Sequence, residues 1–155
     1  MKGILTETDT ARQELSAYFC QLADSFGLPR SVALIFATLF LAENPLPVSK
    51  IIEESGLSKG SVSGGVRLLE RMGFIHLVFD PSDRRTFYRP ELSLRRLAAG
   101  LIEENFTPAL KRGETLLKEV AKSSELSDHL ETRLASLQTW NENALGLLLA
   151  LSLLD

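Results

Sequence analysis

The side chains that could bind a charged partner are concentrated in one segment of the sequence. Residues 59–96 contain eight Lys and Arg against four Asp and Glu, a charge of +4, whereas the whole chain of 155 residues has a net charge of −3. Lys and Arg bind nucleic acids by neutralising phosphates. The net charge alone argues against such a partner, but its distribution predicts one basic face on an acidic body.

A group of small polar residues stands at the start of this segment and can bind phosphate. Hydroxyl groups and backbone N–H groups at the N-terminus of a helix bind phosphate oxygens, and a lysine adds positive charge. The group consists of Ser58, which is the expected helix cap, and of Lys59, Gly60, Ser61 and Ser63. Arg67 follows by one helical turn, so it can reach a phosphate or a guanine edge. We therefore expect this helix to contact double-stranded DNA.

Two glycines, Gly64 and Gly65, lie inside the same predicted helix. Each glycine destabilises a helix interior by about 0.8–1 kcal/mol relative to alanine. Two explanations are open: close approach of the helix to the DNA backbone, or close approach to a neighbouring helix. Because few long side chains remain for base edges, we expect much phosphate and shape readout and limited direct reading of bases.

The helix that carries these residues is the second of a predicted helix-turn-helix. The first helix covers residues 48–55 and the second covers residues 58–72. Ile52, Gly56 and Val62 lie at relative positions 0, +4 and +10, the spacing at which two such helices lock together. This geometry would let the second helix enter the major groove. Two packed helices without a role in DNA binding remain the alternative.

A hairpin is predicted directly after the helix-turn-helix. Residues 74–79 and 86–88 are rich in strand-forming side chains and flank a turn that carries Arg84 and Arg85. A hairpin with two arginines at its tip, following a helix-turn-helix, makes a DNA-binding interpretation more favourable than two packed helices alone.

Two further helices are predicted before the helix-turn-helix. The first covers residues 9–26, and Thr10 with Gln13 reads as its capping box. The second covers residues 30–43 and is apolar almost all round, so we expect it to be central and buried. Residues 44–47, with two prolines, are expected to be a break.

The remainder of the chain is predicted to be helical. Pro108 is expected to kink or restart a helix, with Thr107 as a cap. A last helix begins at about Leu126 and carries residues at alternating spacings of four and three, which is a heptad seam with one polar member. The seam consists of Leu130, Leu134, Leu137, Asn141, Ala144, Leu148 and Leu151. It is too apolar to face water, so we expect it to form a dimer interface.

Other chemistry is not indicated by the sequence. Cys20 is the single cysteine, so it forms no intramolecular disulfide, and a packed thiol is favoured over a redox sensor. His76 is expected to pack or face phosphate; neither it nor His129 has a partner at ligand spacing, so no metal or cofactor is expected. No catalytic motif is present, so we expect no enzyme.

A membrane protein is not indicated either. The longest apolar stretch has 11 residues, whereas a bilayer span needs about 20. The first residues lack the apolar stretch of a signal peptide. We therefore expect a cytoplasmic protein without membrane contact.

The helix-turn-helix and hairpin resemble those of a known family. Residues 46–63 and 68–75 resemble the MarR-like winged helix-turn-helix regulators, and residues 27–32 and 83–88 look more like their GbsR branch. The resemblance implies a homodimeric transcriptional regulator that often responds to a small molecule. It also implies that a wing arginine, here Arg84 or Arg85, enters the minor groove.

These observations predict a mainly α protein: a winged helix-turn-helix with a small β-hairpin wing and terminal dimerisation helices. Residues 1–26 and 92–155 would form the dimer, and residues 27–91 would bind DNA. The predicted function is sequence-specific transcriptional regulation, by default repression, on a pseudo-palindromic operator. A small-molecule effector would bind among the first, second and fifth helices. The alternative functions are a winged-helix protein-interaction module and, less favoured, a small enzyme with an unfamiliar site.

Overall fold

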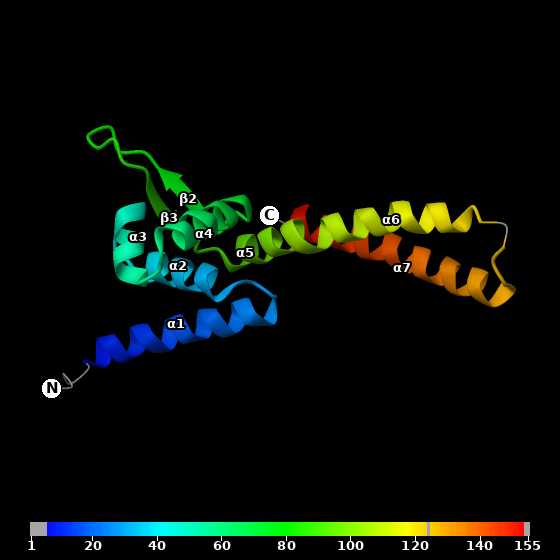
Figure 1. Ribbon diagram of the computed structural model, residues 1–155, viewed down its shortest axis with the longest axis horizontal. Helices are drawn as coiled ribbons and strands as arrows, with labels where there is room; N and C mark the ends of the chain where they lie inside the picture. Colours follow the sequence, from blue (N-terminus) through cyan, green and yellow to red (C-terminus); the bar gives the residue numbers. More distant parts are fainter. Residues whose placement is uncertain (1–5, 124, 154–155) are drawn as a thin grey trace. The chain divides into compact units, whose positions relative to one another are not determined.

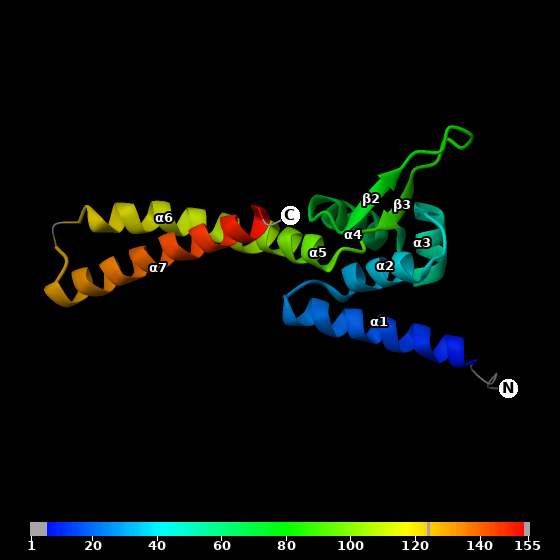
Figure 2. The same ribbon diagram turned by 180° about the vertical axis from the view of Figure 1, so that it is seen from behind.

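The structure is a computed structural model that describes residues 6–123 and 125–153. The chain divides into two compact units, Met1–Leu97 and Ala98–Asp155. Figures 1 and 2 show the elements of each unit from opposite sides. The first unit contains α1 (Glu7–Ser25), α2 (Arg30–Leu41), β1 (Leu46–Pro47), α3 (Val48–Ser55), α4 (Lys59–Arg71), β2 (Ile75–Val78) and β3 (Phe87–Pro90). After α5 (Leu94–Leu101), the second unit continues with the π-helical turn η1 (Ile102–Phe106), α6 (Thr107–Ala121) and α7 (Asp128–Leu153).

The core of the first unit is built around α2. Its side chains Ile35 and Leu39 are almost completely buried, and α1, α3 and α4 all contact it. Phe19 of α1 packs against Phe36 and Phe40 of α2 with ring centroids 5.1 and 5.0 Å apart. The prediction of a central, buried helix is therefore confirmed, although α2 ends at Leu41, two residues before the predicted end.

The sheet has three antiparallel strands in the order β1-β3-β2. Leu77 of β2 and Leu46 of β1 lie opposite the same residue of β3, Tyr88. The predicted hairpin is confirmed, and so is the break of the helix at residues 44–47, since α2 ends at Leu41. The sequence did not indicate that Leu46 and Pro47 form a short strand that pairs with β3. Proline has no N–H to donate, so it is tolerated here because β1 is an edge strand.

Two predicted helix caps are wrong, and a third is confirmed. Helix α1 begins one turn before the predicted capping box, because Thr6 and Asp9 form the box instead, with Asp9 N donating to Thr6 Oγ1 at 3.1 Å. Thr107 has helical backbone angles and does not cap α6; Pro108 lies in the first turn, where its missing N–H costs little. Ser58 caps α4 as predicted, and Gly56 before it has a positive φ of 68°.

The second unit contains the predicted seam of α7, which packs in part on α6. Leu134 and Asn141 are buried, and Asn141 Nδ2 donates a hydrogen bond to the Leu110 carbonyl of α6 at 3.1 Å. Both residues therefore contribute to the contact of α7 with α6 in the same chain. Leu130 and Leu137 are exposed. A dimer interface over the seam stays a prediction.

No helix among residues 6–123 and 125–153 is long and apolar enough to cross a membrane.

The two glycines inside α4 lie in different surroundings. A methyl group at Gly65 would clash with Cδ1 of the buried Ile35, whereas no atom lies within 4 Å of a methyl group at Gly64. Of the two explanations given above, close approach to a neighbouring helix therefore applies to Gly65. Gly64 is exposed and adds no side chain to the exposed face of α4.

We predict opposite effects of alanine at these two positions. Gly64→Ala should raise the free energy of unfolding by up to about 1 kcal/mol, because alanine favours the helix. Gly65→Ala should lower it by about 1–2 kcal/mol, because the cost of overpacking against Ile35 exceeds the gain in helix propensity. Urea unfolding followed by circular dichroism measures both. Equal shifts in the two variants would contradict the assigned packing.

Candidate nucleic-acid interface

The predicted phosphate-binding residues all lie on the exposed side of the start of α4. Ser58, Lys59, Gly60, Ser61 and Ser63 are exposed. The opposite side of α4 packs into the core through Val62, Val66 and Leu69. Burial of that side thus fixes which residues face solvent, and it is the reason that the polar residues gather on one surface.

Local hydrogen bonds hold the polar side chains of this surface. Ser58 Oγ accepts a hydrogen bond from the Ser61 backbone N at 3.2 Å and donates one to Ser61 Oγ at 3.0 Å. Arg67 donates from Nε to the Ser63 carbonyl and from a terminal nitrogen to Ser63 Oγ, both at 3.2 Å. A guanidinium has five N–H donors. Arg67 therefore keeps donors for a phosphate or a base edge while it lies over Ser63.

The two wing arginines differ in their surroundings. Arg85 forms an ion pair with Asp83, with a shortest nitrogen–oxygen distance of 2.6 Å, and its guanidinium carbon lies 5.3 Å from the centre of the Phe87 ring. The hydrogen bonds from the Arg85 side chain and backbone lower the pKa of the Asp83 carboxyl. Arg84 is exposed and has no hydrogen-bond or ion-pair partner among the described residues.

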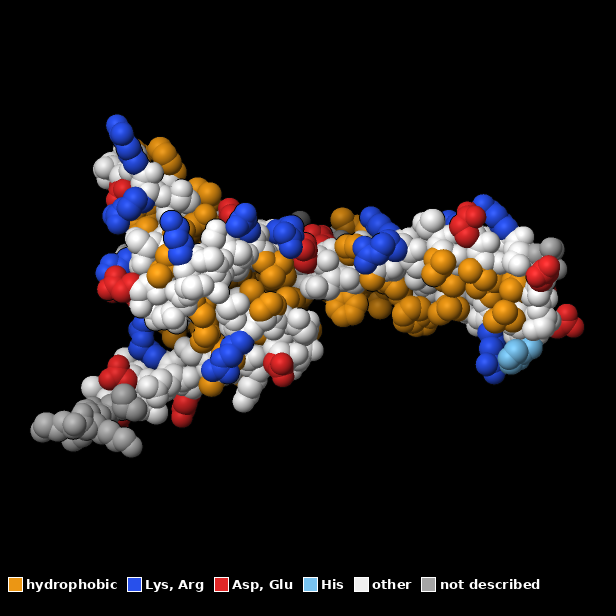
Figure 3. Space-filling model, in the orientation of Figure 1, with side chains coloured by type: hydrophobic (Ala, Val, Ile, Leu, Met, Phe, Trp, Pro, Cys, Tyr) orange, Lys and Arg blue, Asp and Glu red, His pale blue; other side chains and the backbone are white. Residues whose placement is uncertain are grey.

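The turn before these arginines is shaped by a second aspartate. Asp80 Oδ1 accepts hydrogen bonds from Ser82 N at 2.9 Å and from Ser82 Oγ at 2.7 Å, and both lower the pKa of the Asp80 carboxyl. Asp83 N donates to the Asp80 carbonyl at 3.1 Å. The polar turn thus fixes the tip of the wing without buried side chains. Figure 3 shows Lys and Arg side chains at this tip.

Sequence reasoning missed Glu91, a buried carboxylate just after β3. Its side chain is only 8% exposed and accepts a hydrogen bond from His76 of β2, at 2.9 Å between Nε2 and Oε2. The interpretation of His76 as a packing or phosphate-facing residue therefore did not include its hydrogen bond to Glu91. A histidine and an acid 15 residues apart give no sequence signal for such a pair; only the register that places β2 beside β3 brings them together.

Hydrogen bonding keeps Glu91 ionised. The hydrogen bonds from the Ser93 backbone and from His76, in that order of importance, lower its pKa from 4.5 to about 2 in spite of burial. A group with a lowered pKa stabilises the fold fully above its unfolded value and progressively less as the pH falls toward the folded value. The contribution of Glu91 is therefore present above about pH 4.5 and is lost between pH 4.5 and about 2.

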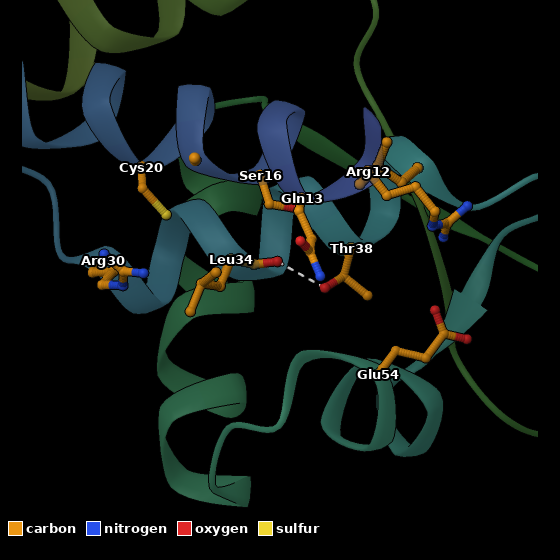
Figure 4. Close-up of a pocket in the computed structure, with 10 residues that line it drawn as sticks. Arg12, Gln13, Ser16, Cys20, Arg30, Leu34, Thr38 and Glu54 are labelled. Atoms are coloured by element: carbon orange, nitrogen blue, oxygen red, sulfur yellow. Dashed lines mark hydrogen bonds between the residues drawn. The ribbon is translucent and has the colours of Figure 1, made fainter. Parts of the chain in front are cut away.

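A hollow of about 310 Å³ lies among α1, α2 and α3. Figure 4 shows Gln13 of α1 directed toward Thr38 of α2, whose hydroxyl donates to the Leu34 carbonyl at 2.8 Å. The lining includes Arg12, Ser16, the half-buried Cys20, Arg30 and Glu54. The predicted effector site was placed among the first, second and fifth helices, whereas this hollow is lined by the third helix and by no residue of α5.

Comparisons with known proteins agree with this architecture. Residues 26–86 match the MarR_2 model of the MarR family. The HTH-type transcriptional repressor OpcR of Bacillus subtilis (strain 168) is 25% identical over 130 residues, which cover 84% of this chain and 69% of that protein. A crystal structure of a transcriptional regulator has a TM-score of 0.70 at 18% identity and covers 91% of this chain and 95% of its own. Residues 26–86 are thus similar to the MarR family model, and the fold is that of a winged helix.

A weaker similarity is found to a further solved structure. It is that of a MepR mutant from S. aureus bound to an oligodeoxyribonucleotide, with a TM-score of 0.40 at 18% identity. It covers 88% of this chain and 93% of that chain.

Proposed function

With a MarR-type winged helix at residues 26–86 as the premise, we propose that this chain is a DNA-binding transcriptional regulator. It acts as a homodimeric repressor on a pseudo-palindromic operator, and residues 27–32 and 83–88 favour the GbsR branch of the family. The observation that carries the proposal is the exposed polar start of α4 beside a wing with an exposed arginine, Arg84. Similarity to a protein named as a repressor supports repression. No enzymatic activity is part of the proposal.

The geometry supports distinct roles for α4 and the wing. The start of α4 would enter the major groove, where serine hydroxyls, Lys59 and Arg67 bind phosphates or base edges. Arg84 would enter the adjacent minor groove, while Arg85, held by Asp83 and Phe87, shapes the wing. Because Gly60 and Gly64 add no side chains to the exposed side of α4, few long side chains remain there, and phosphate and shape readout would predominate.

We predict that Arg84 contributes directly to DNA affinity. Arg84→Ala should weaken binding by about tenfold and make affinity less dependent on salt, because one fewer counterion is released from the DNA. Gel shifts with a duplex from the region upstream of the gene, at several salt concentrations, measure both effects. Arg133→Ala removes the same charge from an exposed position of α7 and should leave affinity unchanged.

Two outcomes would contradict the assignment. Unaltered affinity of Arg84→Ala would remove that arginine from the interface. Absence of binding by the wild-type chain at low salt would remove DNA binding itself. In the second case the exposed Leu77 and Phe79 of the wing, 55% and 79% exposed, favour the protein-interaction alternative.

Exposed apolar side chains support the homodimer. Leu137 and Trp140 of α7 are 49% and 60% exposed, and Figure 3 shows apolar side chains gathered along α6 and α7. Leu15 and Tyr18 expose a second apolar stripe on α1. Contiguous apolar surface of this kind is typical of interfaces. We propose that residues 1–26 and 92–155 contribute to a dimer that includes Leu130, Leu148 and Leu151.

A charge on the exposed side of α7 should therefore produce monomers. Leu137→Glu would bury an unpaired carboxylate in the dimer but leaves the contact of α7 with α6 intact, because Leu137 is already exposed in the single chain. Sedimentation equilibrium measures the change. Thr139→Glu places the same charge at an exposed position of the same helix and serves as the control. An unchanged dimer in Leu137→Glu would exclude this surface.

The hollow among α1, α2 and α3 is the place proposed for a small-molecule effector. Two arginines, Arg12 and Arg30, line it together with apolar and hydroxyl side chains, so small carboxylates are the ligands that we would test. Aliphatic and aromatic monocarboxylates should raise the melting temperature of the wild-type chain. They should not raise that of Ser16→Trp, whose indole would fill the hollow. Equal shifts in both proteins would place the ligand elsewhere.

A further inference from the structure

We propose that Glu91 is a positioning residue that holds the root of the wing to the first turn of α5, so that presentation of Arg84 to DNA depends on it. This inference rests on the proposed function. It assigns to Glu91 an effect on DNA binding that is separate from its contribution to stability, although Glu91 itself is buried and cannot touch DNA.

On the wing side, Glu91 is bound to β2 and to Phe74, the residue before β2. Its backbone N donates to the Phe74 carbonyl at 2.8 Å, and Oε2 accepts from His76 Nε2 at 2.9 Å. The ladder between β2 and β3 continues directly to this point, since Ile75 lies opposite Pro90. Glu91 therefore closes the base of the hairpin whose tip carries Arg84.

On the other side, the same carboxylate is bound to the start of α5. Oε1 accepts from the backbone N of Leu92 at 2.9 Å and of Ser93 at 2.8 Å. Oε2 also accepts from Arg96 of α5 at 3.3 Å. Ser93 in turn accepts at Oγ from the Arg96 backbone N at 3.4 Å. One buried carboxylate thus joins β2, the turn after β3 and the first turn of α5.

The burial of this carboxylate makes the arrangement specific. A buried charge is costly unless its oxygens are hydrogen-bonded, so a movement of α5 away from the wing, which removes the Arg96 donor from Glu91, is unfavourable. The wing and the first turn of α5 are therefore expected to move together. Among the described residues, the polar contacts at the wing tip are all local, so the direction of the tip depends on this base.

Glutamine at this position separates the contacts. In Glu91→Gln the carbonyl oxygen, in the place of Oε1, can still accept from Leu92 and Ser93. The amide nitrogen, in the place of Oε2, can accept neither from Arg96 nor from His76. The variant keeps the size of the side chain and the hydrogen bonds of the turn, and it loses the acceptor that joins β2 to α5. It is therefore a test of positioning rather than of packing.

A double-mutant cycle with Arg84→Ala tests the proposal. If Glu91 only stabilises the fold, the effects of Glu91→Gln and Arg84→Ala on DNA affinity add, because the two side chains share no partner among the described residues. If Glu91 positions the wing, Arg84→Ala should weaken binding about tenfold in the wild type and less than about threefold in Glu91→Gln. Affinities are measured on the same upstream duplex, at a temperature at which circular dichroism shows all four proteins folded.

Glu43→Gln is the matched control. Glu43 is an exposed acid of the first unit, so this variant makes the same change of charge away from the wing base. The full effect of Arg84→Ala should persist in its background. If Glu91→Gln is unfolded at the chosen temperature, the cycle is repeated with His76→Ala, which removes the wing-side contact and should reduce the effect of Arg84→Ala in the same way.

Additive effects on DNA affinity in the cycle with Glu91→Gln, or in the cycle with His76→Ala that replaces it, would overturn the proposal. Failure of the proposed function would be seen in the wild-type chain, which would then not bind the duplex. The two failures are therefore distinguishable in one experiment.

Discussion

The packing of α4 against α2 at Gly65 is the constraint on which the rest of the first unit depends. Gly65 lets α4 lie close to Ile35, a side chain that is fully buried at the centre of the core. This contact fixes the rotation of α4 about its axis, since Val62 and Leu69 must be buried with it. The polar start of the helix is exposed as a consequence. A core contact thus determines which residues are available to a partner.

The wing is held by a different kind of interaction. Its tip is ordered by Asp80 and Asp83 through local hydrogen bonds and one ion pair, and its base is ordered by the buried Glu91. Exposed local pairs contribute little to stability because solvent screens them. They can still fix the direction of a side chain. Two adjacent arginines of equal charge consequently have different surroundings, and only Arg84 is directed to solvent without a partner among the described residues.

Local patterns in the sequence predicted most of the first unit, and contacts between distant residues could not be predicted. The bounds of α3, the cap at Ser58 and the buried side of α4 follow from periodicity and cap chemistry within a few residues. The pairing of Pro47 with Phe87 and the contact of His76 with Glu91 depend on strand register, which no local pattern specifies. For a similar reason the sequence did not distinguish the two wing arginines. The shape of the turn determines that Asp83 pairs with Arg85 and not with Arg84.

Asn141 affects the alignment of α7 along α6, and thereby which leucines of the second unit face outward. Its carboxamide donates to the Leu110 carbonyl and is buried between α6 and α7, opposite the glycine at position 113. A sliding of α7 along α6 by one heptad would leave that amide buried without its acceptor, at a cost of about 1–3 kcal/mol. Leucines alone would accept several alignments of nearly equal energy. The Gln138 amide also donates to α6, at the Leu117 carbonyl, 3.3 Å away. The two amides together favour one alignment and give the outward-facing leucines a constant pattern.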